Sequence, residues 1–83
     1  MMSSILEVRL NSQPARFPAG TTVRQLVEQQ TGKQLGSDGR AADGSKLGVA
    51  VAVDGAVVPR SAWHAVVLPA GAQIDVVTAA QGG

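Results

Sequence analysis

The sequence predicts a small α+β domain in which one main helix packs across a mixed sheet of four to five strands. Three observations predict this class: short apolar runs with strand periodicity near both ends of the chain, one apolar stripe with helical spacing between them, and turn-forming residues that separate the elements. The chain has 83 residues, enough for one domain with a modest core. Its 45% hydrophobic and 16% charged residues are typical of a folded, soluble protein.

The first two strands are expected to form a hairpin over residues 5–10 and 15–17. Side chains in the first segment alternate as in a half-buried strand, with three apolar residues on one face: Leu6, Val8 and Leu10. Asn11-Ser12 has the chemistry of a turn. Pro14 and Pro18 frame the second strand, and prolines are tolerated where a strand forms the edge of a sheet.

One helix is expected after Thr22. Thr22 and Gln25 have the spacing of a capping box, in which each residue satisfies a backbone amide of the other. The apolar residues that follow form a single stripe at i, i+3 and i+4: Val23, Leu26 and Val27. Gly32 is placed to end the helix in the left-handed conformation. This helix is expected to cover one face of the sheet.

Residues 36–46 are polar and rich in glycine, which predicts a mobile surface loop. They lack the Gly-Lys-Ser/Thr ending of a phosphate-binding loop. Val49–Val53 then alternates valine with alanine, and Asp54-Gly55 is a strong hairpin-turn signal that leads into a short strand ended by Pro59. The last strand is expected over residues 73–77.

This order of elements describes a β-grasp (ubiquitin-like) arrangement, with the last strand in the middle of the sheet beside the first. Residues 1–77 are expected to form the β-grasp domain. Residues 78–83 are expected to form a flexible C-terminal Gly-Gly tail that projects from this platform.

Composition excludes several classes of function. The formal net charge is +1 and the sequence has no basic stripe with interleaved aromatics, so no nucleic-acid partner is expected. No apolar run is long enough to cross a bilayer and no signal peptide is recognisable, so a cytoplasmic protein without a membrane partner is expected. Cysteine is absent and His64 is the single histidine, so neither a metal site nor an iron–sulfur cluster is expected. Ser61 and His64 lack an oxyanion-hole motif, and no catalytic residue is predicted.

The strongest functional signal is Gln81-Gly82-Gly83. Glycine has no Cβ and tolerates unusual φ values, so such a segment can thread a narrow channel in another protein. Its carboxylate then serves as a chemical handle for a partner enzyme. The alternative is a loose terminal segment in which the two glycines are incidental.

Segments of the chain resemble, in order, the ThiS family of sulfur carriers of thiamine biosynthesis. The resemblance rests on the helix entry, the middle segment, and the final strand with its tail: Gly20-Thr21-Thr22-Val23 with Leu26, then Val53-Asp54-Gly55, Val57-Val58-Pro59-Arg60 and Trp63, then Leu68, Gly71, Ile74, Val76-Val77 and Gln81-Gly82-Gly83. It covers most of the chain outside residues 33–47. Two departures are the long glycine-rich loop and Ala72, which stands where an acidic residue often follows the glycine.

The resemblance implies a carrier that is the substrate of other enzymes and is not itself an enzyme. A ThiF-like adenylyltransferase, similar to the ubiquitin-activating enzymes, would use MgATP to adenylate the Gly83 carboxylate. A sulfur donor such as a cysteine desulfurase or a persulfide carrier would convert it to a thiocarboxylate, and a ThiG-like thiazole synthase would take the sulfur. The carrier itself would bind no cofactor.

The resemblance and the strand pattern together define the candidate site. Gly83 is the expected point of sulfur attachment, and Gly82 and Gln81 give the tail access to the partner. The face of the sheet opposite the helix is expected to dock a partner through small apolar residues, Ala50, Ala52 and Val77, and Arg60 is a further docking candidate. Trp63 is expected to lie in the core beneath the Pro59-Arg60 turn, and the alternative is that it helps to dock a partner.

Two other functions stay open from the sequence. The small subunit of molybdopterin synthase also ends in Gly-Gly, so the chain could carry sulfur for molybdopterin or another pathway. A β-grasp domain can also act purely as a non-catalytic interaction module.

Overall fold

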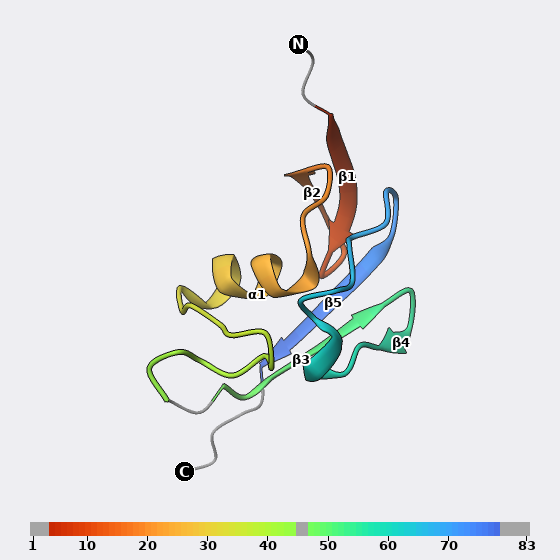
Figure 1. Ribbon diagram of the computed structural model, residues 1–83. Helices are drawn as coiled ribbons and strands as arrows, with labels where there is room; N and C mark the ends of the chain where they lie inside the picture. Colours follow the sequence, from red (N-terminus) through yellow and green to blue (C-terminus); the bar gives the residue numbers. More distant parts are fainter. Residues whose placement is uncertain (1–3, 45–46, 79–83) are drawn as a thin grey trace.

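The computed structural model describes residues 4–44 and 47–78 and has a β-grasp fold, as predicted (Figure 1). Its elements in chain order are β1 (Ile5–Leu10), β2 (Gln13–Pro18), α1 (Val23–Thr31), β3 (Val49–Val53), β4 (Ala56–Val57), the 3-10 helix η1 (Arg60–Ala62) and β5 (Gln73–Thr78). Within these residues the strands form one five-stranded sheet in the order β2-β1-β5-β3-β4. β5 pairs parallel to β1 and antiparallel to β3, so the last strand is central, as predicted.

A two-residue turn connects the strands in each of the two hairpins, β1–β2 and β3–β4. Asn11 and Ser12 have φ values of 50° and 71°, and Asp54 and Gly55 have 51° and 85°. Positive φ at both turn residues matches the right-handed twist of the flanking strands, which is why Asn and Gly are favoured there. β2 begins at Gln13, two residues earlier than predicted, because Leu10 and Gln13 already pair across the turn.

The two prolines of β2 confirm that this strand is an edge. Pro14 pairs with Arg9 and Pro18 with Ile5, and the pair next to the turn is Leu10 with Gln13. Hydrogen-bonded and non-hydrogen-bonded pairs alternate along an antiparallel ladder, so both prolines occupy positions whose nitrogen points away from β1. The missing N–H groups therefore cost no ladder hydrogen bond.

Helix α1 begins and ends where the sequence predicts. The Thr22 hydroxyl accepts from the Gln25 amide at 3.2 Å, and the Gln25 side chain accepts from the Thr22 amide at 2.9 Å. Gly32 has φ 74° and donates its amide to the Glu28 carbonyl. The apolar stripe of the helix is fully buried against the sheet: Val23, Leu26 and Val27.

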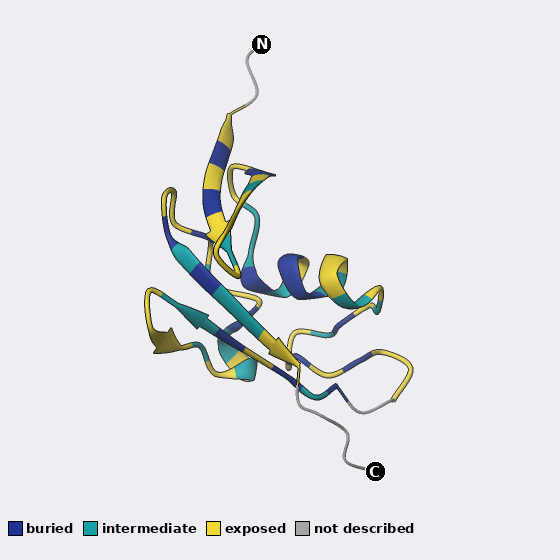
Figure 2. Ribbon diagram, turned by 180° about the vertical axis from the view of Figure 1, so that it is seen from behind, coloured by how far each residue is buried: buried dark blue, intermediate teal, exposed yellow. Residues whose placement is uncertain are grey.

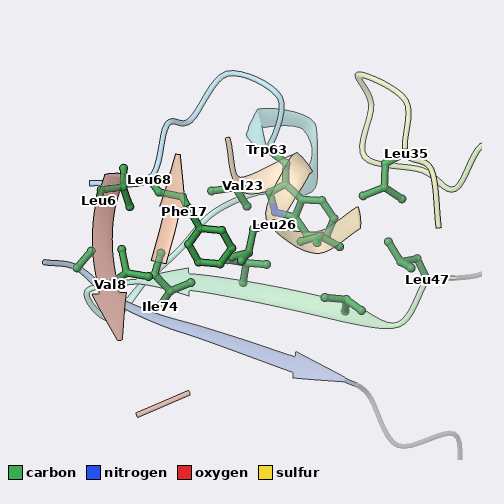
Figure 3. Close-up of a cluster of buried hydrophobic side chains, with 14 of the residues drawn as sticks. Leu6, Val8, Phe17, Val23, Leu26, Leu35, Leu47, Trp63, Leu68 and Ile74 are labelled. Atoms are coloured by element: carbon green, nitrogen blue, oxygen red, sulfur yellow. The ribbon is translucent and has the colours of Figure 1, made fainter. Parts of the chain in front are cut away.

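The core lies between α1 and the inner face of the sheet. Burial alternates along β1, with Leu6 and Val8 inside and their neighbours exposed (Figure 2). Trp63 is 1% exposed and lies in the core, as predicted, and it packs near the helix (Figure 3). Its indole nitrogen donates to the Val58 carbonyl at 3.0 Å, so burial leaves no unpaired donor on the ring.

One boundary and one surface assignment predicted from the sequence need correction. β5 extends to Thr78, one residue beyond the predicted end of the domain, because Thr78 still pairs with Val49. The glycine-rich segment is less of a surface loop than predicted. Ser37 and Asp38 are exposed, but Ala41 is buried and belongs to the core.

Candidate functional site

The predicted attachment and access residues, Gln81, Gly82 and Gly83, lie outside the described residues. The structure does describe the strand that leads toward them. β5 pairs with β3 over five residues, from Ile74 opposite Val53 to Thr78 opposite Val49. The chain therefore approaches its carboxyl end along a central strand of the sheet rather than from an edge.

Side chains at the two turns hold β5 in place. β1 ends at Leu10 while β5 continues. The side-chain oxygen of Asn11 accepts a hydrogen bond from the Val76 amide at 2.8 Å, in place of the backbone carbonyl that a longer β1 would provide. On the other side, the Asp54 carboxylate accepts from the Gln73 amide at 2.9 Å. Each turn residue therefore extends a ladder past the end of its own strand.

The sheet face opposite α1 carries the predicted docking residues together. Ala50 pairs with Val77, and Ala52 pairs with Asp75 on one side and Val57 on the other. Directly paired residues point to the same face, and the buried residues of these strands alternate with them. The predicted placement of Ala50, Ala52 and Val77 on one face is therefore confirmed, whereas their role in docking stays a prediction.

Sequence reading missed one member of this face. Val57 is 72% exposed and Val77 is 60% exposed, and both flank the alanines of β3. The two-residue Asp54-Gly55 turn could have identified Val57, because it fixes the register that places residue 57 opposite residue 52. Asp75, which pairs with Ala52, points to the same face, and we call the four apolar members of this face the outer apolar face: Ala50, Ala52, Val57 and Val77.

The guanidinium of Arg60 forms hydrogen bonds with backbone carbonyls of the same chain. It donates to the carbonyl of Leu47 at 2.6 Å and to that of Val49 at 3.2 Å. It also lies 5.4 Å from the centre of the Trp63 ring, within the range of a cation–π interaction. These contacts give Arg60 a structural role between η1 and the start of β3, and its role in partner docking stays a prediction.

A pocket of about 340 Å³ lies beside the start of α1 and has no titratable side chain in its lining: Phe17, Pro18, Ala19, Gly20, Thr21, Gln25 and Gln29. Within residues 4–44 and 47–78, no group of three or more His, Cys, Asp or Glu side chains is placed to hold a metal ion. None of the helices described has the length and apolar character needed to cross a membrane. The candidate site is therefore the outer apolar face together with the end of β5.

Comparisons with known proteins are consistent with this fold. The ThiS family model matches residues 8–83. The crystal structure of the thiamine biosynthesis protein ThiS from Geobacter metallireducens is similar, with a TM-score of 0.61 and 21% sequence identity over 94% of this chain and 100% of that chain. At that identity the likeness bears on the fold alone. No curated protein matches this chain in sequence.

Proposed function

This chain belongs to the ThiS family, and on that premise we propose that it is a sulfur carrier of thiamine biosynthesis that carries sulfur as a thiocarboxylate on Gly83. The observation that carries the proposal is the family match, which runs from β1 through Gly83. The central position of β5 supports it, because a strand anchored on both sides is a rigid base from which a carboxyl terminus can be presented.

The chemistry requires a partner that activates the carboxylate. A carboxylate is a poor electrophile because its leaving group would be oxide. In the proposed first step a ThiF-like adenylyltransferase joins the Gly83 carboxylate to the AMP portion of MgATP and releases pyrophosphate. A persulfide of the sulfur donor, such as a cysteine desulfurase, then attacks the acyl carbon and displaces AMP, which leaves an acyl disulfide. A second thiol cleaves the sulfur–sulfur bond and frees the thiocarboxylate.

This chain contributes the handle and a docking surface rather than a catalytic group. It has no cysteine, and its single histidine, His64, is exposed. Gly82 and Gln81 are proposed to pass through the channel of the partner, where a side chain at residue 82 would obstruct entry. The outer apolar face is proposed to dock the adenylyltransferase, since Val77 lies on the strand that leads directly to the tail.

The proposed sulfur acceptor is a ThiG-like thiazole synthase. The molybdopterin pathway is the less favoured alternative, because the family model that matches is that of ThiS. A pure interaction module would need neither the adenylation nor the sulfur transfer.

Intact-mass measurement tests the proposal. The chain is incubated with the adenylyltransferase of its own genome, MgATP, a persulfide donor and a free thiol that cleaves the acyl disulfide, and is expected to gain the mass difference between one sulfur and one oxygen. A variant that lacks Gly83 is the control and is expected to gain nothing. A wild-type chain whose mass stays unchanged under these conditions would exclude the carrier function.

A further inference from the structure

The loop between α1 and β3 lies at the end of the molecule from which the tail departs. β5 runs antiparallel to β3, so Thr78, its last residue, lies beside Val49, the first residue of β3. The segment that enters β3 therefore reaches the sheet at this end, as the ribbon shows (Figure 1). We call residues 33–44 the tail-end loop.

Hydrogen bonds and buried side chains fold the tail-end loop onto the body. Leu35 and Ala41 form a β-bridge, and the amide of Ala42 donates to the carbonyl of Gln34 at 2.7 Å. Leu35 and Ala41 are 5% and 6% exposed and belong to the core. The amide of Leu35 also donates to the Glu28 carboxylate of α1 at 2.8 Å. The loop therefore has a defined position relative to the helix.

Gly39 and Arg60 fix the loop relative to the sheet. A Cβ built on Gly39 would lie 2.6 Å from the carbonyl oxygen of Arg60, so the backbone of the loop touches η1 at a point where no side chain fits. Arg60 in turn donates to the carbonyls of Leu47 and Val49. Since Val49 pairs with Thr78, a short series of contacts connects the loop to the last described residue of β5.

Within residues 33–44, Arg40 is a cation whose side chain has no partner among the residues that the structure describes. Lys33 pairs with Asp43 at 3.6 Å, and the Asp38 carboxylate accepts from the backbone amide of Arg40 at 3.0 Å. Arg40 is exposed, and its guanidinium makes no hydrogen bond or ion pair with any residue that the structure describes. A free guanidinium favours a planar carboxylate as its partner.

The short tail brings this loop close to any enzyme that acts on Gly83. Residues 79–83 span at most about 18 Å when fully extended. An active site that holds the Gly83 carboxylate must therefore lie within that distance of Thr78. Because the nucleotide-binding site of the enzyme is recessed, the rim of its cavity lies nearer to the β-grasp domain of this chain than the Gly83 carbonyl does. The end of the domain that carries Thr78 and the tail-end loop then faces that rim.

From this geometry we infer that the tail-end loop is a second docking element for the enzyme that adenylates Gly83, and that Arg40 pairs with a carboxylate on the rim of that enzyme. The inference rests on the proposed function. The proposed contact of Arg40 is a charged one, in addition to the contacts of the outer apolar face. It helps to select the cognate enzyme, since charges at the rim of an interface mainly affect encounter rate and specificity.

Steady-state adenylation of two charge-reversal variants tests the inference. Arg40→Glu is expected to raise the KM of the adenylyltransferase for this chain by about five- to tenfold with kcat unchanged, because a rim contact contributes to ground-state and transition-state binding equally. Arg40→Lys keeps the charge and is expected to retain most of the wild-type KM. Arg16→Glu is the matched control, since Arg16 is an exposed arginine on the edge strand β2 and makes only a long ion pair of 4.0 Å with Glu7. Its KM is expected to stay within about twofold of the wild type, as for an isolated surface charge.

The outcomes separate this inference from the function on which it rests. Equal KM values for Arg40→Glu and Arg16→Glu, with wild-type adenylation intact, would overturn the docking role of the loop and leave the carrier function standing. An Arg40→Glu variant that is adenylated normally but is defective in thiazole formation would likewise overturn the docking role of the loop and leave the carrier function standing. If the wild-type chain is not adenylated at all, the carrier function fails and the inference fails with it. Circular dichroism confirms that each variant is folded.

Discussion

Replacing Gly39 by alanine tests how the tail-end loop is held against the body. Gly39 has φ +79°, and a Cβ added there would lie 2.6 Å from the backbone oxygen of Arg60. Gly44, in the same loop, has φ +80°, and no heavy atom beyond its chain neighbours lies within 4 Å of its Cβ position. The two glycines therefore share the same backbone conformation and differ in steric contact.

The expected losses of stability follow from these two terms. An alanine held in the left-handed region costs about 1–2 kcal/mol, so Gly44→Ala is expected to lower the free energy of unfolding by about 1 kcal/mol. Overpacking against a neighbour adds about 1–3 kcal/mol, so Gly39→Ala is expected to lower it by about 3 kcal/mol. For a domain of this size the difference between the variants corresponds to about 10 °C in Tm.

Urea unfolding followed by the fluorescence of Trp63 measures both losses. Trp63 is the single tryptophan and is 1% exposed, so its emission reports global unfolding. In the folded state the Arg60 guanidinium lies 5.4 Å from the ring, so its displacement by the new methyl group is expected to alter the native emission of Gly39→Ala alone. Equal losses of stability for the two variants would refute the contact between the loop and Arg60.

Three further predictions concern β5, the tail and the outer apolar face. Asn11→Ala removes the side-chain acceptor of the Val76 amide in β5 and is expected to lower the free energy of unfolding in urea by about 1 kcal/mol. Ser12→Ala is its control, because Ser12 is in the same turn and also has positive φ. A loss for Asn11→Ala no larger than that for Ser12→Ala would contradict the role of the hydrogen bond. Gly82→Leu is expected to prevent adenylation in an intact-mass assay while the unfolding midpoint stays unchanged, and normal adenylation would show that the channel accepts a side chain. Val77→Ser is expected to raise the KM for adenylation by about three- to tenfold, since it removes apolar surface from the docking face. Ile5→Ser is its control, because Ile5 is 65% exposed and lies at the other end of the sheet, and an equal rise in KM would argue against a localised docking face.

The secondary structure followed closely from local signals. The capping box of Thr22 and Gln25, the helix-ending Gly32 and the turn at Asp54-Gly55 all depend on residues at most three positions apart. Such interactions form in almost any surrounding, so the pattern of residues is sufficient to predict them. The central position of the last strand also agreed with the order of the elements.

Contacts between distant segments were missed. The sequence marks Asn11 only as a turn residue, but its side chain accepts a hydrogen bond from the amide of Val76, 65 positions further along the chain. The guanidinium of Arg60, a predicted docking residue, also joins η1 to Leu47 and Val49, a contact that no local spacing indicates.

For this protein, the amino-acid pattern alone determined the identity and order of the five strands and of α1, together with the family resemblance, because periodicity, caps and turns are properties of neighbouring residues. The tertiary structure decided how the glycine-rich segment is used. Its buried Leu35 and Ala41 and the close approach of Gly39 to Arg60 exist only after α1, η1 and β3 have come together. A polar, glycine-rich stretch reads as a loop in any context, and packing against the body is what gives it a defined place beside the end of β5.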